Sequence, residues 1–441
     1  MRRFWLCSLL LVVLAAGLAA QPYAGDFIIA GSWYSTMDTV ARIDRSTLKF
    51  STLLGRLNTT STSAYNVEVM MAENNSDFYV FSSSLKSVFL VDAAGTLLKT
   101  VFDGTAVLGT PYDMALDQNG DILIGDYARG IFRVDRTTGI STLILTTLQL
   151  GTTLRAITND IDSGNLLIAD GTNRIKRYDI VTGAVTSISP AAPGAFRYQV
   201  EQDHATGRIY TGTCCSTATS GSGMFVFDPS TQLWQTLVGA TNPPLRAWYA
   251  HRFDRRVQSA GNNLIYSWVC GFAIANNFSA LASLTEQGVI TTLVTGGTPA
   301  TGVLTAYGME IEGSRNAVSL RTAAPNNRNI DLSFPNEGGK AYVAALGLSG
   351  VRPSIPLGDG RVVNLTPDQI TWASLSNWLP GIFGPPTGVL DAFGRATLKL
   401  NANVLGAAIR GQPVWVAVVV LDPKASAGIA VVAETLVIKM E

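Results

Sequence analysis

The residues with the clearest capacity for chemistry are two histidines, one in a predicted strand and one in a predicted turn. His251 stands beside Arg252 in a predicted strand, where an imidazole could act as a general base near neutral pH. A lone histidine in a strand is more often a packed, hydrogen-bonded residue, so the packed role is favoured over the general-base role. His204 lies in the turn Asp203-His204-Ala205-Thr206-Gly207 and is expected to face solvent. The histidines alone therefore define no catalytic signature.

Metal and nucleophile motifs are weak or missing in this sequence. The run Asp117-Gln118-Asn119-Gly120-Asp121 alternates oxygen ligands as a calcium loop does, but it lacks the glycine at the sixth place and the distal glutamate. The equivalent run Asp162-Ser163-Gly164-Asn165 favours a plain hairpin turn. No GxSxG elbow, HExxH helix, phosphate-cradling loop or paired-cysteine metal motif occurs, which argues against hydrolase and nucleotide-binding functions.

Three cysteines would remain after removal of a leader that contains Cys7. They are Cys214, Cys215 and Cys270, and an exported protein would meet oxidising conditions. A bridge from Cys270 to Cys214 or Cys215, a bridge between the adjacent pair, and no bridge all remain open. The first is favoured because the repeat described next puts both segments at equivalent places in neighbouring units.

A repeat of about 45 residues must position these side chains. Its clearest copy, residues 112–145, predicts four short strands separated by Gly, Asn and Asp turns. The Asp that closes each third strand recurs at spacings of 48, 43, 44 and 49 residues, at Asp44, Asp92, Asp135, Asp179 and Asp228. Stacked four-stranded units of this kind predict a β-propeller, and counting them gives six.

The ends of the repeat region predict that the ring closes. The first copy, residues 25–54, lacks its leading strand, and a spare leading strand occurs at residues 307–312. We therefore expect Met309 and Ile311 to pair beside Ile28, because pairing would satisfy an exposed strand edge. Residues 21–313 are predicted to form the propeller.

The first strand of each propeller unit lines the central bore, so side chains at its start should converge. The outer level contains Asn66, Asp113, Arg155 and Gln199, and the level below contains Glu68, Glu201, Arg252 and Glu310. These residues are candidates for binding a small polar ligand. The alternative, which is favoured, is a wet channel mouth whose charges pair with one another.

The run Leu166-Leu167-Ile168-Ala169-Asp170-Gly171-Thr172-Asn173-Arg174-Ile175 resembles the NHL-type repeat of six-bladed propellers. The wider superfamily includes gluconolactonase-like and virginiamycin lyase-like enzymes. This resemblance implies the fold over roughly residues 25–313. It also implies that an enzyme of this type would hold calcium or another divalent cation, for which Glu68, Asn66 and Asp113 are the nearest equivalents. The Glu-Gly-Pro-type motif of the lactonases is absent.

Composition and the N-terminal segment limit the expected location and partners of the protein. A formal net charge of +0 argues against nucleic acid or an anionic membrane as the main partner. Residues 1–20 combine Arg2 and Arg3, an apolar run and terminal small residues, which predicts a cleaved signal peptide and export. No later segment is predicted to span a membrane. The location is expected to be extracellular, at the cell surface or periplasmic.

A different β pattern begins near Ala317, and residues 314–441 are predicted to form a β-sandwich. The run 344–350, followed by Val419-Val420-Leu421-Asp422-Pro423, resembles a C-terminal module of large exported bacterial proteins. The sequence as a whole predicts an all-β, non-enzymatic propeller that presents a face to a protein or glycan partner. The competing hypothesis is a lactonase or lyase that uses a bore-bound ion with Glu68, Asp113 and His251.

Overall fold

The computed structural model describes a chain built almost entirely from short antiparallel strands. The described residues are 26–33, 36–54, 67–72, 77–117, 119–194, 196–213, 223–239, 247–253, 264–270, 279–295, 304–311, 318–324, 327–404, 409 and 411–440. The helices among them are short: α2 (Thr147–Leu150), α3 (Gln369–Leu375), and the 3₁₀ turns η3 (Ala402–Val404) and η5 (Ser426–Gly428). Within the described part, no helix has the length and apolar character that crossing a membrane requires.

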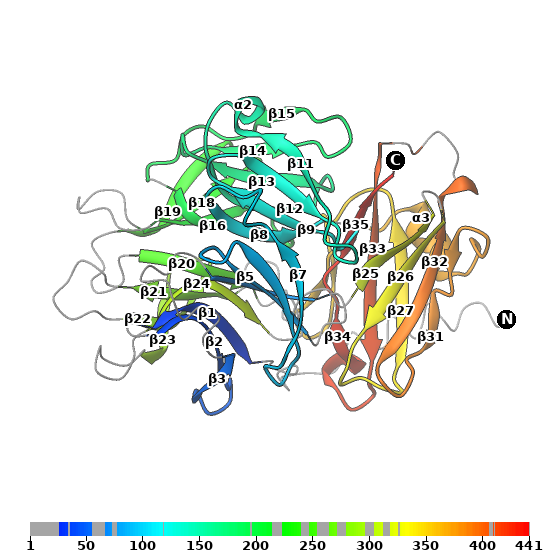
Figure 1. The fold of residues 1–441 in the computed structure, drawn as a ribbon. Helices are drawn as coiled ribbons and strands as arrows, with labels where there is room; N and C mark the ends of the chain where they lie inside the picture. Colours follow the sequence, from blue (N-terminus) through cyan, green and yellow to red (C-terminus); the bar gives the residue numbers. More distant parts are fainter. Residues whose placement is uncertain are drawn as a thin grey trace.

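The described residues before 312 form six four-stranded sheets (Figure 1). The first sheet has the order β24 (Leu304–Ile311), β1 (Phe27–Trp33), β2 (Thr36–Ile43) and β3 (Phe50–Leu54). The second, third and fourth sheets contain β4 (Val67–Met71), β5 (Phe78–Ser82), β6 (Ser87–Val91) and β7 (Leu97–Asp103); β8 (Pro111–Leu116), β9 (Ile122–Asp126), β10 (Gly130–Val134) and β11 (Ser141–Thr146); and β12 (Leu154–Asp160), β13 (Asn165–Asp170), β14 (Ile175–Tyr178) and β15 (Val185–Ser187). The fifth and sixth contain β16 (Phe196–Gln202), β17 (Ile209–Thr213), β18 (Gly223–Asp228) and β19 (Leu233–Gly239); and β20 (Ala247–Phe253), β21 (Leu264–Cys270), β22 (Ser279–Thr285) and β23 (Ile290–Thr295).

The recurring aspartates shape the turn between the third and fourth strands of these sheets. Asp135 Oδ1 accepts hydrogen bonds from the backbone N–H groups of Thr137 at 2.9 Å and Thr138 at 2.7 Å. Asp44, Asp92, Asp179 and Asp228 make equivalent bonds within their own turns. An aspartate in this role holds the turn by satisfying backbone donors that the ladder leaves unpaired. The repeat spacing therefore reflects turn chemistry.

The first sheet takes one strand from the far end of the repeat region. Strand β24 pairs antiparallel with β1, with Ile28 opposite Glu310 and Ile29 opposite Met309. This is the pairing that the sequence predicts. The paired apolar side chains are buried, so the junction contributes hydrophobic burial in addition to backbone hydrogen bonds.

Apolar clusters join each of the six sheets to the next. One cluster spans the second, third and fourth sheets, and others join the fourth to the fifth and the fifth to the sixth. Phe27 and Leu281 belong to a cluster shared by the sixth and first sheets, and Ile28 and Val69 to one shared by the first and second. Face-to-face packing of successive four-stranded sheets in this order gives a propeller-like fold.

The described residues from 318 onward form two further sheets that share an apolar cluster. One sheet has the order β25 (Val318–Ala324), β26 (Asn327–Ser333), β32 (Arg395–Asn401) and β30 (Phe383–Gly384). The other has the order β31 (Thr387–Val389), β27 (Ala341–Gly347), β33 (Pro413–Leu421) and β34 (Ile429–Val432), with β35 (Leu436–Lys439) also paired to β33; β28 (Ile355–Pro356) and β29 (Val362–Val363) form a separate hairpin. Leu320 and Ile330 from the first sheet pack in one cluster with Leu346 and Val416 from the second.

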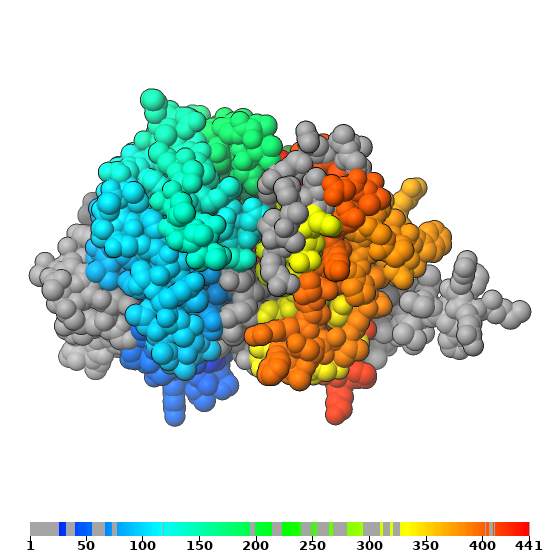
Figure 2. Space-filling view, turned by 45° about the vertical axis from the view of Figure 1, so that its right-hand side comes forward, coloured from blue at the N-terminus to red at the C-terminus, as the bar shows by residue number. Residues whose placement is uncertain are grey.

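These C-terminal sheets pack against one end of the propeller-like part. Ile161, which follows β12, lies in an apolar cluster with Val351, Trp415 and Val437. The Trp415 indole donates to the Ile161 carbonyl at 2.8 Å. Figure 1 shows β33 and β35 on the side that faces the propeller sheets, and Figure 2 shows the two parts as adjoining lobes. We call this contact the junction.

Polar bonds reinforce the junction on both sides of that cluster. Lys439 donates to Asn165 Oδ1 at 2.8 Å and to Asp179 Oδ2 at 2.6 Å. Arg352 bonds the Asp162 carboxylate and donates to the His204 carbonyl at 3.1 Å. Every propeller residue in these bonds lies in or beside a turn at the same end of its sheet. The C-terminal sheets therefore occupy that end through both apolar and charged contacts.

Candidate functional site

The first strands of the six sheets, which were predicted to line a bore, contact one another. Strands β4, β8, β12, β16, β20 and β24 each contact the next, and β24 contacts β4. Seven of the predicted site residues on these strands have side chains that are at most 3% exposed: Glu68, Asp113, Gln199, Glu201, His251, Arg252 and Glu310. The sequence favoured a wet channel mouth for these groups. They are instead withdrawn from solvent, because the strands approach each other closely enough for their side chains to fill the space between them.

Asp113 and Gln199 link neighbouring sheets. Asp113 Oδ2 accepts the backbone N–H of Ile157 at 2.6 Å, and its Oδ1 accepts the N–H of Met114 at 2.9 Å. The Gln199 side-chain carbonyl accepts the backbone N–H of His251. Both side chains thus satisfy a buried backbone donor on the next first strand. A ligand in the bore would have to displace these bonds.

Arg252 lies between two carboxylates. Its Nη1 is 3.5 Å from Glu201 Oε2, and its Nε is 4.0 Å from Glu310 Oε2. The same guanidinium donates to the His251 carbonyl at 3.2 Å. The charges predicted to converge in the bore do converge, and they are arranged to neutralise one another.

Glu68 is a buried carboxyl group beside other acidic side chains. Burial, followed by the nearby negative charge of Asp113, raises its pKa well above the usual range. Both of its carboxyl oxygens are buried and have no hydrogen-bond partner in the described residues. Burial also raises the pKa of Asp113 to about 7, although the N–H groups that it accepts and the Arg252 charge oppose that rise. The cluster therefore holds protons at pH values where exposed carboxylates are ionised.

His251 is placed as a packed residue. Its side chain is fully buried and its Nε2 lies 3.4 Å from the Tyr210 carbonyl oxygen. Burial lowers its pKa to about 4, against the opposing charge of Glu201. A neutral imidazole with no exposed surface has no route to a substrate. The geometry favours the packed role over the general-base role.

Arg155 lies apart from the other predicted ligand residues. The prediction grouped it at one level with Asp113, but Asp113 bonds the backbone two residues further along β12, and β-bulges interrupt the pairing near Tyr112 and near Arg155. The bulges keep Arg155 at the start of its strand. Its guanidinium carbon lies 4.6 Å from the centroid of the Tyr127 ring and 6.0 Å from that of Tyr112. Among the predicted ligand residues that the structure describes, Arg155 is half-buried and the others are buried.

Within the predicted metal set, Asp113 is poorly placed to bind a divalent cation. Both Asp113 oxygens accept backbone N–H groups, and the charge of Arg252 acts on Glu68 as well as on Asp113. No group of three or more His, Cys, Asp or Glu side chains suited to a metal occurs in the described residues. Asn66, Cys214 and Cys215 lie outside those residues, as does the side chain of Cys270, so the complete ligand set and the disulfide remain predictions.

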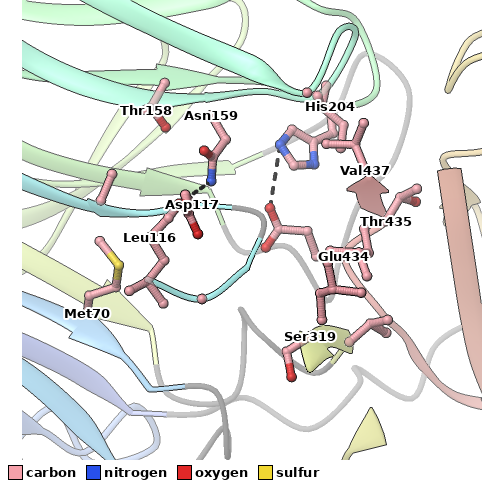
Figure 3. A pocket seen from close by; sticks show the side chains of 17 residues that line it. Met70, Leu116, Asp117, Thr158, Asn159, His204, Ser319, Glu434, Thr435 and Val437 are labelled. Carbon is pink, nitrogen blue, oxygen red and sulfur yellow. Dashed lines mark hydrogen bonds and ion pairs between the residues drawn. The ribbon is translucent and has the colours of Figure 1, made fainter. Parts of the chain in front are cut away.

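A cavity of about 100 Å³ at the junction was not foreseen from sequence (Figure 3). Its lining combines the ends of β8 and β12 with β25 and with residues 434–437. His204 is buried here and its Nε2 lies 3.5 Å from Glu434 Oε1, which corrects the prediction that His204 faces solvent. The physical reason is tertiary: the turn is covered by a segment that is remote in sequence, so no local pattern indicates it.

Asp117 is also at this cavity and acts as a turn residue. It accepts the N–H groups of Asn119 at 2.7 Å and Asp121 at 3.0 Å, and its Oδ2 is 2.9 Å from Arg133 Nε. Burial raises its pKa to about 6, although Arg133 opposes the rise. These bonds agree with the hairpin turn that the sequence favoured over a calcium loop.

Comparison with known proteins adds fold-level likenesses. No protein-family model matches the chain. No curated protein sequence matches it. A chain of the crystallised nidogen/laminin complex aligns with a TM-score of 0.48 and 15% identity, covering 65% of this chain and 98% of that one.

Two further solved structures are similar over the same extent. A protein of unknown function from Bacteroides caccae aligns with a TM-score of 0.45 and 13% identity, covering 65% of this chain and 98% of that one. Streptogramin B lyase aligns with a TM-score of 0.42 and 15% identity, covering 64% of this chain and 87% of that one. The propeller-like fold follows from the strand pairings and sheet packing described above.

Proposed function

We propose that this chain is an exported, non-enzymatic propeller of six blades, closed by β24 and followed by a β-sandwich, that binds a protein or glycan partner. In this proposal residues 1–20 are a signal peptide, residues 21–313 form the propeller and residues 314–441 form the sandwich, which positions or attaches it. The pairing of β24 with β1 and the cluster shared by the sixth and first sheets support closure.

The observation that carries the non-enzymatic function is the burial of the bore. The described side chains predicted for catalysis or ion binding are at most 3% exposed, and Arg252 beside them lies against Glu201 and Glu310. An enzyme must expose its reacting groups to substrate and must hold them within hydrogen-bond reach of it. Side chains that bond neighbouring first strands support a structural role.

The position of the junction indicates which end of the propeller would bind. Trp415, Lys439 and Arg352 contact residues just beyond the ends of first strands or in nearby turns. The opposite end, where β8 and β12 begin, presents α2 and the residue Arg155. Leu148 on α2 is 90% exposed, which is unusual for a large apolar side chain. We name this surface the mouth face.

The proposed function is tested with the full-length mature protein on a glycan array and on a panel of immobilised extracellular proteins. The variant Leu148→Glu places a charge on the mouth face, and the matched control Val289→Glu, at a side chain 61% exposed in a turn at the other end of the sixth sheet, does not. We expect Leu148→Glu to reduce binding at least fivefold and the control to leave it unchanged. The reverse pattern would reject the mouth face.

The metal-dependent enzyme is kept as a second candidate because of Glu68. Its two unpartnered oxygens are acceptors that a cation would satisfy. Metal analysis and thermal melting with and without EDTA decide between the candidates. A bound ion at a hundredfold excess over its Kd stabilises a protein by about 2.7 kcal/mol, so chelation would produce a large shift. Absence of a stoichiometric ion together with an unchanged melt would support the binding protein.

A further inference from the structure

Arg155 is a cationic side chain on the mouth face, and no residue in the described part of the chain accepts its N–H groups. Arg155 makes no hydrogen bond or ion pair with any residue that the structure describes, and its contacts are the rings of Tyr127 and Tyr112. A guanidinium carries five N–H donors in a fixed fork. Those donors are therefore available to a group from outside the chain.

Several other cations in these sheets bond acceptors within the chain. Arg133 lies 2.9 Å from Asp117, Lys176 lies 3.2 Å from Asp170, and Arg177 lies 2.6 Å from Asp160. Arg129, which is exposed at the same face, donates to the Val107 carbonyl. Lys86 donates to the Leu108 carbonyl at 2.8 Å. Arg155 differs from these cations because it contacts two rings and no described residue accepts its N–H groups.

The two rings fix the direction of the guanidinium. Tyr112 and Tyr127 have centroids 5.5 Å apart and are tilted by 46°. Tyr127 is anchored by its own backbone, which donates to the Thr110 carbonyl at 2.8 Å, and by the neighbouring carboxylate of Asp126, which accepts the N–H groups of Ala128 and Arg129. A guanidinium that contacts a ring through its face keeps its N–H fork for other partners. An Arg held in this way is preorganised for a planar anion.

Three threonines lie close in sequence to the residues of this arrangement. Thr110 and Thr153 each precede, by two positions, the residues Tyr112 and Arg155, and Thr152 adjoins them. Their hydroxyl groups make no hydrogen bond with the described residues, and each can donate and accept. A carboxylate beside several hydroxyl partners and half-exposed tyrosine rings matches the chemistry of an acidic sugar, because a sugar ring offers both hydroxyls and an apolar C–H face.

We propose that Arg155, Tyr112 and Tyr127 form a carboxylate-binding subsite for a uronate-containing glycan. The proposal rests on the proposed function and narrows its partner to an acidic glycan. Arg155 binds the carboxylate through paired N–H groups, the threonine hydroxyls bind sugar hydroxyls, and the tyrosine rings contact the sugar face. An acidic peptide would share the carboxylate and would lack the hydroxyls.

The test measures binding by calorimetry with tetramers of galacturonate, glucuronate and mannuronate, with their methyl esters, and with tetraglutamate. At least one uronate tetramer is expected to bind, and esterification is expected to weaken it about tenfold or more, since it removes a charge-assisted pair. Tetraglutamate is expected to bind at least tenfold more weakly. No binding by any uronate, or equal binding by tetraglutamate, would overturn the assignment.

Variants separate the subsite from the fold. Arg155→Gln should lose about tenfold or more in affinity, while Arg155→Lys, which keeps the charge and loses the fork, should retain part of it. Arg129→Gln is the matched control and should bind as wild type does. Retention of full affinity by Arg155→Gln would overturn the proposal. If no uronate binds but Leu148→Glu still reduces binding on the glycan or protein array, the proposed function stands and this subsite alone fails.

Discussion

The two ends of the propeller bore differ in what their side chains are bonded to. At the junction, Trp415, Lys439 and Arg352 pair with turns of the propeller, and His204 lies against Glu434. At the mouth face, Arg155 contacts aromatic rings, and no described residue accepts its N–H groups. A charged side chain at an end of these sheets therefore indicates a binding site only when no other residue of the protein neutralises it.

The largest effect on stability is expected from removing the apolar anchor of the junction. Trp415→Ala deletes an indole that is 5% exposed and its hydrogen bond to Ile161. We expect a loss of about 3–5 kcal/mol in the free energy of unfolding, measured with urea. Trp378→Ala, at a side chain 74% exposed, is the control and should change stability by less than about 0.5 kcal/mol. Similar losses in both variants would contradict an anchored junction.

The charged part of the junction gives a smaller effect with a pH signature. Lys439→Met leaves the partners at Asn165 and Asp179 without their donor, and we expect a loss of about 2–3 kcal/mol at pH 7. Burial alone would raise the pKa of Asp179, but the bonds from Lys439 and from backbone N–H groups lower it to about 2.

A lowered carboxyl pKa stabilises the fold above the unfolded value near 3.8, and that contribution disappears as pH falls toward 2. The deficit of Lys439→Met should therefore shrink between pH 4 and pH 2 in urea titrations. Exposed Lys399→Met should match wild type throughout. A deficit that stays constant down to pH 2 would show that the ion pair contributes nothing.

His251, in the interior of the bore, is expected to make the stability of the protein depend on pH. Because burial lowers its pKa to about 4, the folded protein binds a proton there less readily than the unfolded chain, whose value is about 6.5. Wild-type stability should therefore fall by up to about 3 kcal/mol from this group as pH decreases through that window.

The measurement compares His251→Gln with wild type by urea unfolding at pH 7.5 and at pH 4.5. The variant keeps a polar side chain and cannot be protonated, so its deficit at pH 7.5 should become smaller at pH 4.5. Asp113, whose raised pKa acts in the opposite direction, is present in both proteins and cancels. A larger deficit at the lower pH would show that the imidazole is charged in the fold.

The smallest effect on stability is expected at the mouth face itself. Arg155→Gln removes two cation–π contacts from a half-buried site, and a loss of about 0.5–1 kcal/mol is expected in the same urea assay. Arg129→Gln serves again as the control. A loss above about 2 kcal/mol would place Arg155 with the structural residues of the junction and the bore.

Much of the strand pattern was predictable because its causes are local. The aspartates at positions such as Asp135 and Asp179 fix the turns, and the apolar alternation in Met309 and Ile311 indicates a strand that needs a partner. Convergence of Glu201, Arg252 and Glu310 follows from the same repeat, since equivalent positions meet at the axis of a ring.

The burial of the side chains in the bore could not be predicted from the sequence. The β-bulges near Tyr112 and Arg155 change which level each side chain reaches, and no residue type in those stretches signals them. Contacts such as Trp415 with Ile161 join segments that are far apart in sequence, so their partners depend on tertiary packing. The unmet donors of Arg155 emerge only when the bonds of its neighbours are known.

The pairing of Ile28 with Glu310 has a consequence for assembly of the chain. Until β24 is synthesised, β1 has an open edge whose backbone groups can accept any compatible strand. A second copy can supply that strand, because its own β24 carries the same sequence. Chains cut short before residue 304 should therefore keep an open β1 edge and be prone to strand exchange with copies whose own β24 has not yet paired.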